Sequence, residues 1–193
     1  PGRVITNLEF AFPGKVNVEN LTAAIAVALL CGVTENEIRK SIGTFKGVVR
    51  RFDVRYDNHG ITYIDDYAHH PEEIRAFVMS VRDYYPGRKI TGIFQPHLYS
   101  RTRDLADSFA SVLDELDETI ILPVYPAREE PIPGVSSEMI FEKMKSSGKR
   151  MMELNDIPSK IELRNLDILA TIGAGNIDTR IPVIEKALNE AFG

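Results

Sequence analysis

In residues 46–193, short apolar runs alternate with segments of helical period. The apolar runs, which predict buried strands, lie at 61–64, 90–94, 119–122 and 168–172. Between the runs, apolar residues recur every three or four positions, as at Ile74, Phe77, Val78 and Val81. This alternation of strands with amphipathic helices predicts an α/β fold, with an open, mostly parallel sheet and helices on both faces.

Several element boundaries follow from individual residues. The extended runs 48–56 and 61–64 flank a short polar segment, which predicts a hairpin. Pro71 suits the first turn of a helix, where Glu72 and Glu73 meet the positive end of the helix dipole. We expect the remaining helices around 105–116, 137–145 and 181–191, and a short strand at 151–154.

The first 45 residues have a different pattern. Alternation over residues 8–12 predicts a half-buried strand, and Asn17 suits the N-cap of an Ala-rich helix that ends near Gly32. Thr34 and Glu37 have the spacing of a capping box for a second helix. One strand and two helices bury too little apolar surface for an independent core. We therefore expect this segment to be the end of a preceding domain in a longer protein.

Composition excludes some classes of partner. The net charge is −5 and the basic residues are scattered, so no nucleic-acid partner is expected. The longest apolar stretch, residues 23–31, is too short to span a membrane, and no signal peptide is recognisable. The single cysteine, Cys31, cannot form an intramolecular disulfide, which suits the reducing cytoplasm. The sequence indicates no oligomeric state.

Polar residues follow four of the predicted strands directly. They occupy residues 65–71, 95–101, 124–130 and 173–176, and three of the four histidines lie among them. Ligands of open parallel sheets bind beyond the carboxyl ends of the strands. The sequence therefore predicts a functional cleft at this edge of the sheet.

Ordinary structural roles also account for these residues one at a time. Asp65 and Asp66 are typical of a strand that ends in a turn. His69, His70 and His97 lack the helical or hairpin spacing of metal ligands, so we expect no metal site.

Two other features have alternative explanations. Arg101 opens a helix, which is the unfavourable end for a cation unless an anion lies nearby or the side chain is solvated. The turn at Gly173 and Gly175 suits either phosphate binding or tight packing.

Six sequence segments are informative in combination: RRFD at 50–53, DDYAHHP at 65–71, FQPH at 94–97, YSRTRDL at 99–105, EPIPGVS at 130–136 and GAG at 173–175. Together they resemble the Mur ligase family, and within it the members that join L-alanine to UDP-N-acetylmuramate. The resemblance extends over essentially the whole chain.

The resemblance implies a three-domain enzyme. Residues 1–45 would be the end of the central ATP-binding domain, and 46–193 the carboxy-terminal, amino-acid-binding domain with a Rossmann-like sheet. The phosphate-binding loop would precede Pro1, so the chain alone is expected to be inactive. ATP, with Mg²⁺ bound mainly by the upstream domain, would convert the lactyl carboxylate to an acyl phosphate. The amine of alanine would then displace phosphate.

The resemblance also implies two sets of binding residues, but no catalytic nucleophile. For ATP, Asn17 and Asn20 correspond to residues that hold the base, Arg51 to one that reaches the phosphates, and Asp66 to one that meets the ribose. The chain has Val16 where the family often has His, so one nucleotide contact is expected to be missing.

For the amino acid, the resemblance implies contacts by Tyr67, His69, His97 and Arg101, with Arg101 at the carboxylate. The chain has Leu98 where the family often has Arg, which would leave more of that role to Arg101. A murein-peptide recycling ligase and a non-catalytic nucleotide-binding module of the same fold are the alternatives. The segment 95–101 favours the alanine-adding enzyme over the recycling ligase.

Overall fold

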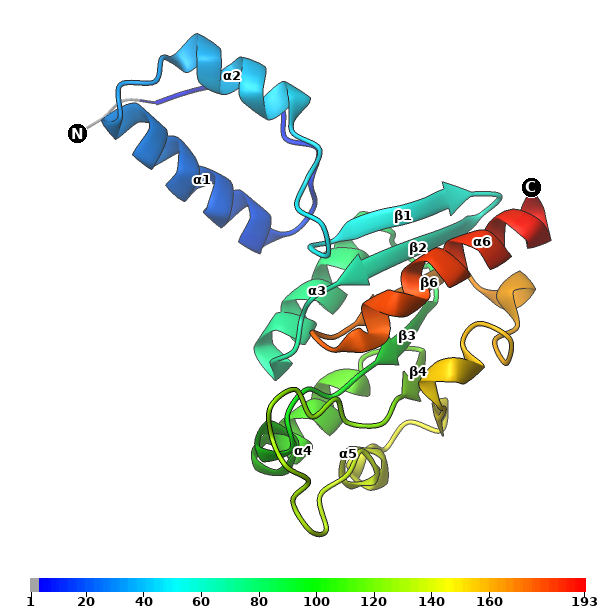
Figure 1. Cartoon of the computed structure of the whole chain (residues 1–193). Helices are drawn as coiled ribbons and strands as arrows, with labels where there is room; N and C mark the ends of the chain where they lie inside the picture. The colour runs from blue at the N-terminus through cyan, green and yellow to red at the C-terminus, as the bar shows by residue number, and fades with distance from the viewer. Residues whose placement is uncertain (1–3) are drawn as a thin grey trace.

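The computed structural model describes residues 4–193, and its main body is built on a six-stranded sheet. The strands are β1 (Asp53–Asn58), β2 (Ile61–Asp66), β3 (Ile90–Phe94), β4 (Glu118–Ile121), β5 (Lys149–Met151) and β6 (Ile168–Ile172). Their order is β1-β2-β6-β3-β4-β5, and only β1 runs antiparallel to its neighbour (Figure 1). The predicted mostly parallel sheet is confirmed.

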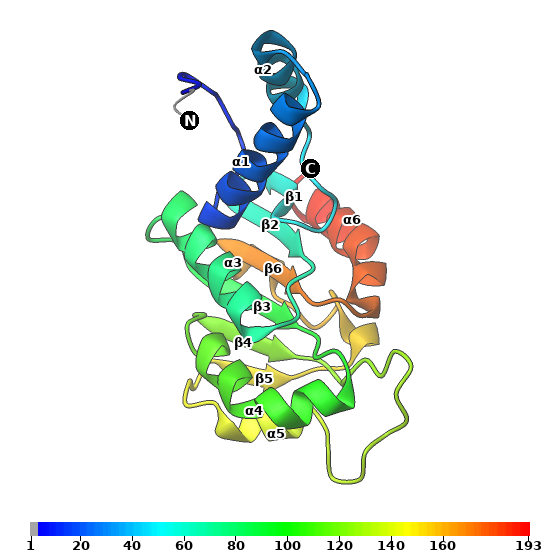
Figure 2. The ribbon, with the colours of Figure 1, turned by 90° about the vertical axis from the view of Figure 1, so that its left-hand side faces the viewer.

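Helices cover both faces of this sheet, as predicted (Figure 2). One face packs against α3 (Pro71–Tyr84), α4 (Tyr99–Leu113) and α5 (Glu138–Lys143), and the other against α6 (Ile181–Phe192). Three short 3₁₀ helices, η1 (Leu154–Asp156), η2 (Leu163–Asn165) and η3 (Asn176–Arg180), precede α6. Every residue of β2, β3 and β6 is buried, because layers of helices lie on both sides.

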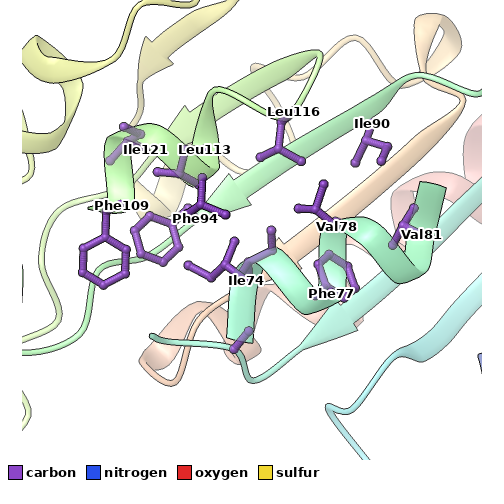
Figure 3. Packing of buried hydrophobic residues seen from close by; sticks show 14 of the residues in the cluster. Ile74, Phe77, Val78, Val81, Ile90, Phe94, Phe109, Leu113, Leu116 and Ile121 are labelled. Atoms are coloured by element: carbon purple, nitrogen blue, oxygen red, sulfur yellow. The ribbon is translucent and has the colours of Figure 1, made fainter. Parts of the chain in front are cut away.

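The larger core cluster joins α3 and α4 to the sheet (Figure 3). On α3, Ile74, Phe77, Val78 and Val81 are all buried, which confirms the period of 3.6 read from the sequence. Burying side chains of this kind contributes about 1.5–3 kcal/mol each. The register of α3 therefore determines where the residues just before Pro71 lie.

Two helices stand apart from the sheet (Figure 1): α1 (Lys15–Leu30) and α2 (Glu35–Thr44). No residue of α1 is buried, and Ile38 is the only buried residue of α2. A Cβ added at Gly14, whose φ is +96°, would lie 2.5 Å from Oγ of Ser80, so glycine permits the close approach to α3. The weak burial agrees with the expectation that residues 1–45 lack a core of their own.

Two predictions for this amino-terminal segment are wrong. Residues 8–12 form no strand; the rings of Phe10 and Phe12 instead pack with Phe45, with centroids 5.3–6.5 Å apart. The alternating pattern therefore reflects aromatic packing between the segment and the end of α2. Asn17 is not the N-cap, because the helix already begins at Lys15, after Gly14. The capping box of Thr34 and Glu37 is confirmed.

Two strand boundaries also differ from the prediction. β1 begins at Asp53, not at 48, because Arg50 and Phe52 have φ values of 62° and 47°, which interrupt an extended run. β5 covers Lys149–Met151, whereas residues 154–156 form η1. Neither shift changes the order of the parallel strands.

Among the described residues, no helix has the length and hydrophobicity needed to cross a membrane.

Candidate functional site

The loops after β2, β3 and β6 meet at one edge of the sheet. The backbone N–H of Gly173 donates to the carbonyl of Asp66 at 3.0 Å, and that of Gln95 donates to the carbonyl of Ile172 at 3.0 Å. His97 pairs with Tyr125, which lies in the loop after β4. The predicted convergence of polar loops at the carboxyl edge is therefore present.

A groove of about 1030 Å³ lies between the pair α1–α2 and the sheet body. Its lining includes all four residues predicted for the nucleotide, namely Asn17, Asn20, Arg51 and Asp66. Apolar side chains of α1 and α2, together with Phe52 and Phe77, form most of the remaining wall. The groove therefore combines an apolar surface with amides, a guanidinium and a carboxylate.

The neighbouring arginines Arg50 and Arg51 have different environments. Arg50 donates to Oδ2 of Asp65 at 3.0 Å and to the carbonyl of Gly173 at 2.5 Å, and it lies 3.3 Å from Asp178. Arg51 is exposed, and within residues 4–193 its guanidinium has no ion pair. It lies over the ring of Tyr67, 5.4 Å from the centroid. Arg51, unlike Arg50, is available to an anion in the groove.

Asp66 is buried at the end of β2 beside the groove. Its Oδ2 accepts from the N–H of Phe52 at 2.8 Å, and its Oδ1 from the N–H of Ala68 at 2.8 Å. Burial raises the pKa of Asp66 to about 6, against the opposing effect of these two bonds and of Arg51. Each oxygen keeps a lone pair for a further donor, such as a hydroxyl group.

Asn17 and Asn20 lie one helical turn apart on α1, on the side that faces the groove. The amide of Asn17 donates to the carbonyl of Pro13 at 2.6 Å, which fixes its orientation, and among the described residues no donor bonds to its oxygen. Asn20 is exposed. The pair offers both amide donors and acceptors to a planar heterocycle.

The four residues predicted for the amino acid also come together. The ring of His69 lies 5.4 Å from that of Tyr67 and 6.0 Å from that of His97, measured between centroids. Nη1 of Arg101, in the first turn of α4, is 3.5 Å from the carbonyl oxygen of His69. We name Tyr67, His69, His97 and Arg101 the histidine–arginine cluster.

His97 has a buried ring nitrogen. Its Nδ1 is buried and has no hydrogen-bond partner among the described residues, and its ring stacks on Tyr125 with centroids 5.8 Å apart. Burial lowers the pKa of His97, and the positive charge of Arg101 lowers it further. A neutral imidazole in this position can accept or donate a hydrogen bond without adding charge.

Sequence reasoning missed three supporting residues. Buried Gln95 donates to Asn176 at 2.8 Å and accepts from the N–H of Ile177 at 2.8 Å, which fixes the loop after β6. Glu129 accepts from the N–H of Ser100 at 2.9 Å, which holds the loop after β4 to the start of α4. Glu73, in the first turn of α3, accepts from the N–H of His69 at 2.9 Å. Glu73 has the spacing of a capping box with His70, and Gln95 and Glu129 lie in the predicted polar loops, but no pattern in the sequence indicated these hydrogen bonds.

The glycines after β6 are explained by packing. A Cβ on Gly175 would lie 2.4 Å from Oε1 of Gln95 and 2.7 Å from Cβ of Tyr125. A Cβ on Gly173, whose φ is +145°, would lie 2.8 Å from the carbonyl oxygen of Gln95. A side chain at either position would push apart the loops that form the histidine–arginine cluster.

Within residues 4–193, no three His, Cys, Asp or Glu side chains are grouped to hold a metal ion.

Comparison with protein families gives one match, over residues 50–175, to the family described as Mur ligase, glutamate ligase domain. The chain is 46% identical over 184 residues to a UDP-N-acetylmuramate–L-alanine ligase of Parabacteroides distasonis, covering 95% of this chain and 40% of that protein. It is 43% identical over 190 residues to the enzyme of the same name from Flavobacterium johnsoniae, covering 98% and 42%. The chain thus spans about two fifths of the length of these relatives.

Solved structures of related ligases have the same fold as this chain. The chain superposes on a UDP-N-acetylmuramate–alanine ligase of Thermotoga maritima with a TM-score of 0.81 and 28% identity, covering 98% of this chain and 41% of that one. A murein peptide ligase of Psychrobacter arcticus has a TM-score of 0.65 at 22% identity, covering 94% and 38%. The second likeness concerns the fold alone.

Proposed function

The chain belongs to the Mur ligase family, and from this membership we propose that it forms the carboxy-terminal part of an ATP-dependent ligase that joins L-alanine to UDP-N-acetylmuramate. In this proposal residues 1–45 end the central ATP-binding domain, and 46–193 form the amino-acid-binding domain. The names of the relatives support the substrates, and the groove and the histidine–arginine cluster support the placement of two binding sites.

One observation carries the proposal: the loop after β2 contributes to both sites. Asp66 lines the groove, whereas His69, three residues later, belongs to the histidine–arginine cluster. Tyr67 stands between them, with the guanidinium of Arg51 over its ring and His69 at its edge. A single loop would therefore hold the nucleotide near the amino acid, as a transfer between the two substrates requires.

On the nucleotide side, Asn17 and Asn20 would bond to the base, and Asp66 would accept from a ribose hydroxyl. Arg51 would approach the phosphates, since in the described part of the chain it has no ion pair to give up. A charge-assisted bond of this kind contributes about 1.5–3 kcal/mol. Mg²⁺ would neutralise charge on the phosphates and is expected to be held mainly by residues outside this chain.

On the amino-acid side, Arg101 would bind the carboxylate of alanine, because a planar guanidinium can meet both oxygens at once. Tyr67, His69 and His97 would surround the remaining groups, a methyl and an ammonium. Little of this chemistry needs a nucleophile from the protein; orientation of the amine and exclusion of water would provide most of the rate acceleration.

The activity belongs, in this proposal, to a longer cytoplasmic protein. Purified residues 1–193 should neither hydrolyse ATP nor form an amide, because the phosphate-binding loop is expected upstream. Turnover by the pure chain above that of a mock preparation would contradict this.

The substrate assignment is tested by product analysis. The ligase that contains this chain would be incubated with ATP, UDP-N-acetylmuramate and, separately, L-alanine, D-glutamate or a muropeptide-type tripeptide, and the products identified by mass spectrometry. We expect an adduct with L-alanine in at least a tenfold excess over the others. A tripeptide adduct as the main product would instead indicate a recycling ligase, and ATP binding without any adduct a non-catalytic module.

A further inference from the structure

Glu73 contacts His69 in two ways and His70 in one, although it lies on α3 and lines the groove, not the histidine–arginine cluster. Its Oε2 accepts from the N–H of His69 at 2.9 Å and from that of His70 at 3.2 Å, and it lies 3.3 Å from Nδ1 of His69. Although partial burial opposes it, these backbone bonds and the nearby cations hold the pKa of Glu73 below its usual range. The side chain is therefore a carboxylate at neutral pH.

These contacts decide which ring nitrogen of His69 carries the proton. Nδ1 is 3.0 Å from the carbonyl oxygen of Tyr67 and 3.3 Å from Oε2 of Glu73. Both neighbours can only accept, so Nδ1 must be the protonated nitrogen in the neutral ring. Nε2 then holds the free lone pair, and within residues 4–193 it has no hydrogen-bond partner.

We propose that Glu73 is a positioning residue that holds His69 with Nδ1 protonated and the lone pair of Nε2 free, so that His69 takes a proton from the ammonium group of the incoming amino acid. This inference rests on the function proposed above. An amino acid brings its nitrogen as an ammonium ion, which cannot attack until it loses a proton. In the histidine–arginine cluster, Nδ1 of His69 already faces two acceptors, which leaves Nε2 of the same ring to accept a proton.

The step is balanced with the substrates of the proposed reaction. Nε2 of His69 takes one proton from the ammonium group, and the freed lone pair on nitrogen forms a C–N bond with the carbonyl carbon of the acyl phosphate, which gives a tetrahedral intermediate. The bond from that carbon to the phosphate oxygen then breaks, and inorganic phosphate leaves with the electron pair. The nitrogen loses its second proton to the departing phosphate, which leaves a neutral amide, and His69 gives its proton to water before the next cycle.

A carboxylate beside Nδ1 selects the tautomer of the ring because it can only accept a hydrogen bond. An amide in its place could also donate to an unprotonated Nδ1. Glu73 is the carboxylate in contact with the ring, 3.3 Å from Nδ1. Its replacement by glutamine should therefore weaken the preference for protonation on Nδ1.

The first test uses residues 1–193 and does not depend on any ligase activity. Two-dimensional ¹⁵N NMR of the four histidines, with His69→Gln to assign the signal, reports the tautomer of each ring. We expect His69 to be protonated on Nδ1, and Glu73→Gln to increase the fraction of the neutral ring that is protonated on Nε2. Glutamine also suits this capping position, so the helix should persist.

Glu72→Gln is the matched control, because it removes the same charge from the same helical turn without a contact to His69. It should leave the tautomer of His69 unchanged. An Nε2-protonated His69 in the unsubstituted chain, or equal changes of tautomer in the two variants, would overturn the role of Glu73 even if the ligase activity is established.

The second test uses the ligase that contains the chain. If Glu73 acts through His69, Glu73→Gln should lower kcat/KM for alanine about three- to tenfold, and it should cause no further loss when His69→Gln is already present. An unchanged kcat/KM in Glu73→Gln, or a full further loss in the double variant, would overturn the proposal, whereas absence of alanine ligation in the unsubstituted enzyme would instead refute the proposed function.

Discussion

Nε of Arg50 lies 3.0 Å from Oδ2 of Asp65, and this ion pair is enclosed at the carboxyl end of β2, where the Asp65 side chain has no exposed surface. The other oxygen of Asp65 accepts from the hydroxyl of Thr171 on β6 at 2.6 Å. Arg50 also bonds to the carbonyl of Gly173. The ion pair thus ties the segment that precedes β1 to two central strands, and it holds Arg51 at the mouth of the groove.

Arg50→Ala should lower the free energy of unfolding by about 3 kcal/mol, because it leaves a buried carboxylate without its cation. Arg51→Ala should change it by about 0.5 kcal/mol or less, since that side chain is exposed. Urea unfolding of residues 1–193 followed by circular dichroism measures both. Equal losses in the two variants would show that the arginines do not have the separate roles described.

Asp66→Asn should raise KM for ATP about tenfold in the ligase and leave KM for alanine within about twofold. A carboxylate contributes roughly 1.5–3 kcal/mol to a bond with a hydroxyl, and a neutral amide retains part of it. Asparagine also gives up one of the two N–H bonds from Phe52 and Ala68, which loosens the backbone beside Arg51. Steady-state kinetics with each substrate varied in turn measure the effect. A rise confined to alanine would show that this loop is assigned to the wrong substrate.

The same carboxyl group should give a pH dependence of stability with a defined sign. Burial raises the pKa of Asp66 to about 6, so between about pH 4 and 6 the folded protein holds a proton that the unfolded chain has lost. The stabilisation is complete below about pH 4 and is lost as the pH rises through 6. Relative to Asp66→Asn, the unsubstituted chain should lose about 2–3 kcal/mol over this range. Parallel stability curves from pH 4 to 7 would contradict the raised pKa.

Much of the sheet could be predicted, because hydrophobic period and turn residues are local properties. The period of α3 and the position of Pro71 determine where that helix begins, and the structure agrees. The segment 8–12 failed for a physical reason: its alternating aromatic residues pack against Phe45, which is distant in sequence, instead of pairing as a strand. The left-handed backbone at Arg50 could not be predicted from the sequence either, since a tertiary ion pair stabilises it.

The candidate site, like the fold, could be predicted from the sequence only in part. The resemblance supplied Asp66 and His69 as binding residues but not their surroundings. That both oxygens of Asp66 already accept backbone N–H groups depends on the loop conformation, which no spacing reveals. Gln95 and Glu129 act across loops that meet only because β3, β4 and β6 are neighbours in the sheet.

The proposed site has a nucleotide side and a separate amino-acid side. Arg51 lines the groove, whereas Arg101 lies beside His69 in the histidine–arginine cluster. Arg101→Ala should therefore raise KM for alanine about tenfold to a hundredfold, equivalent to about 1.5–3 kcal/mol for a charged hydrogen bond. Arg101→Lys should recover part of this loss, because a point charge lacks the bidentate geometry.

The most direct measurement is the set of Michaelis constants for ATP, UDP-N-acetylmuramate and L-alanine in the unsubstituted ligase, Arg51→Ala and Arg101→Ala, each with a thermal melt. We predict that Arg51→Ala raises the constant for ATP alone and that Arg101→Ala raises the constant for alanine alone, with melting temperatures unchanged within about 2 °C. An alanine constant that does not move in Arg101→Ala, or three constants that rise together with a lowered melting temperature, would contradict the account.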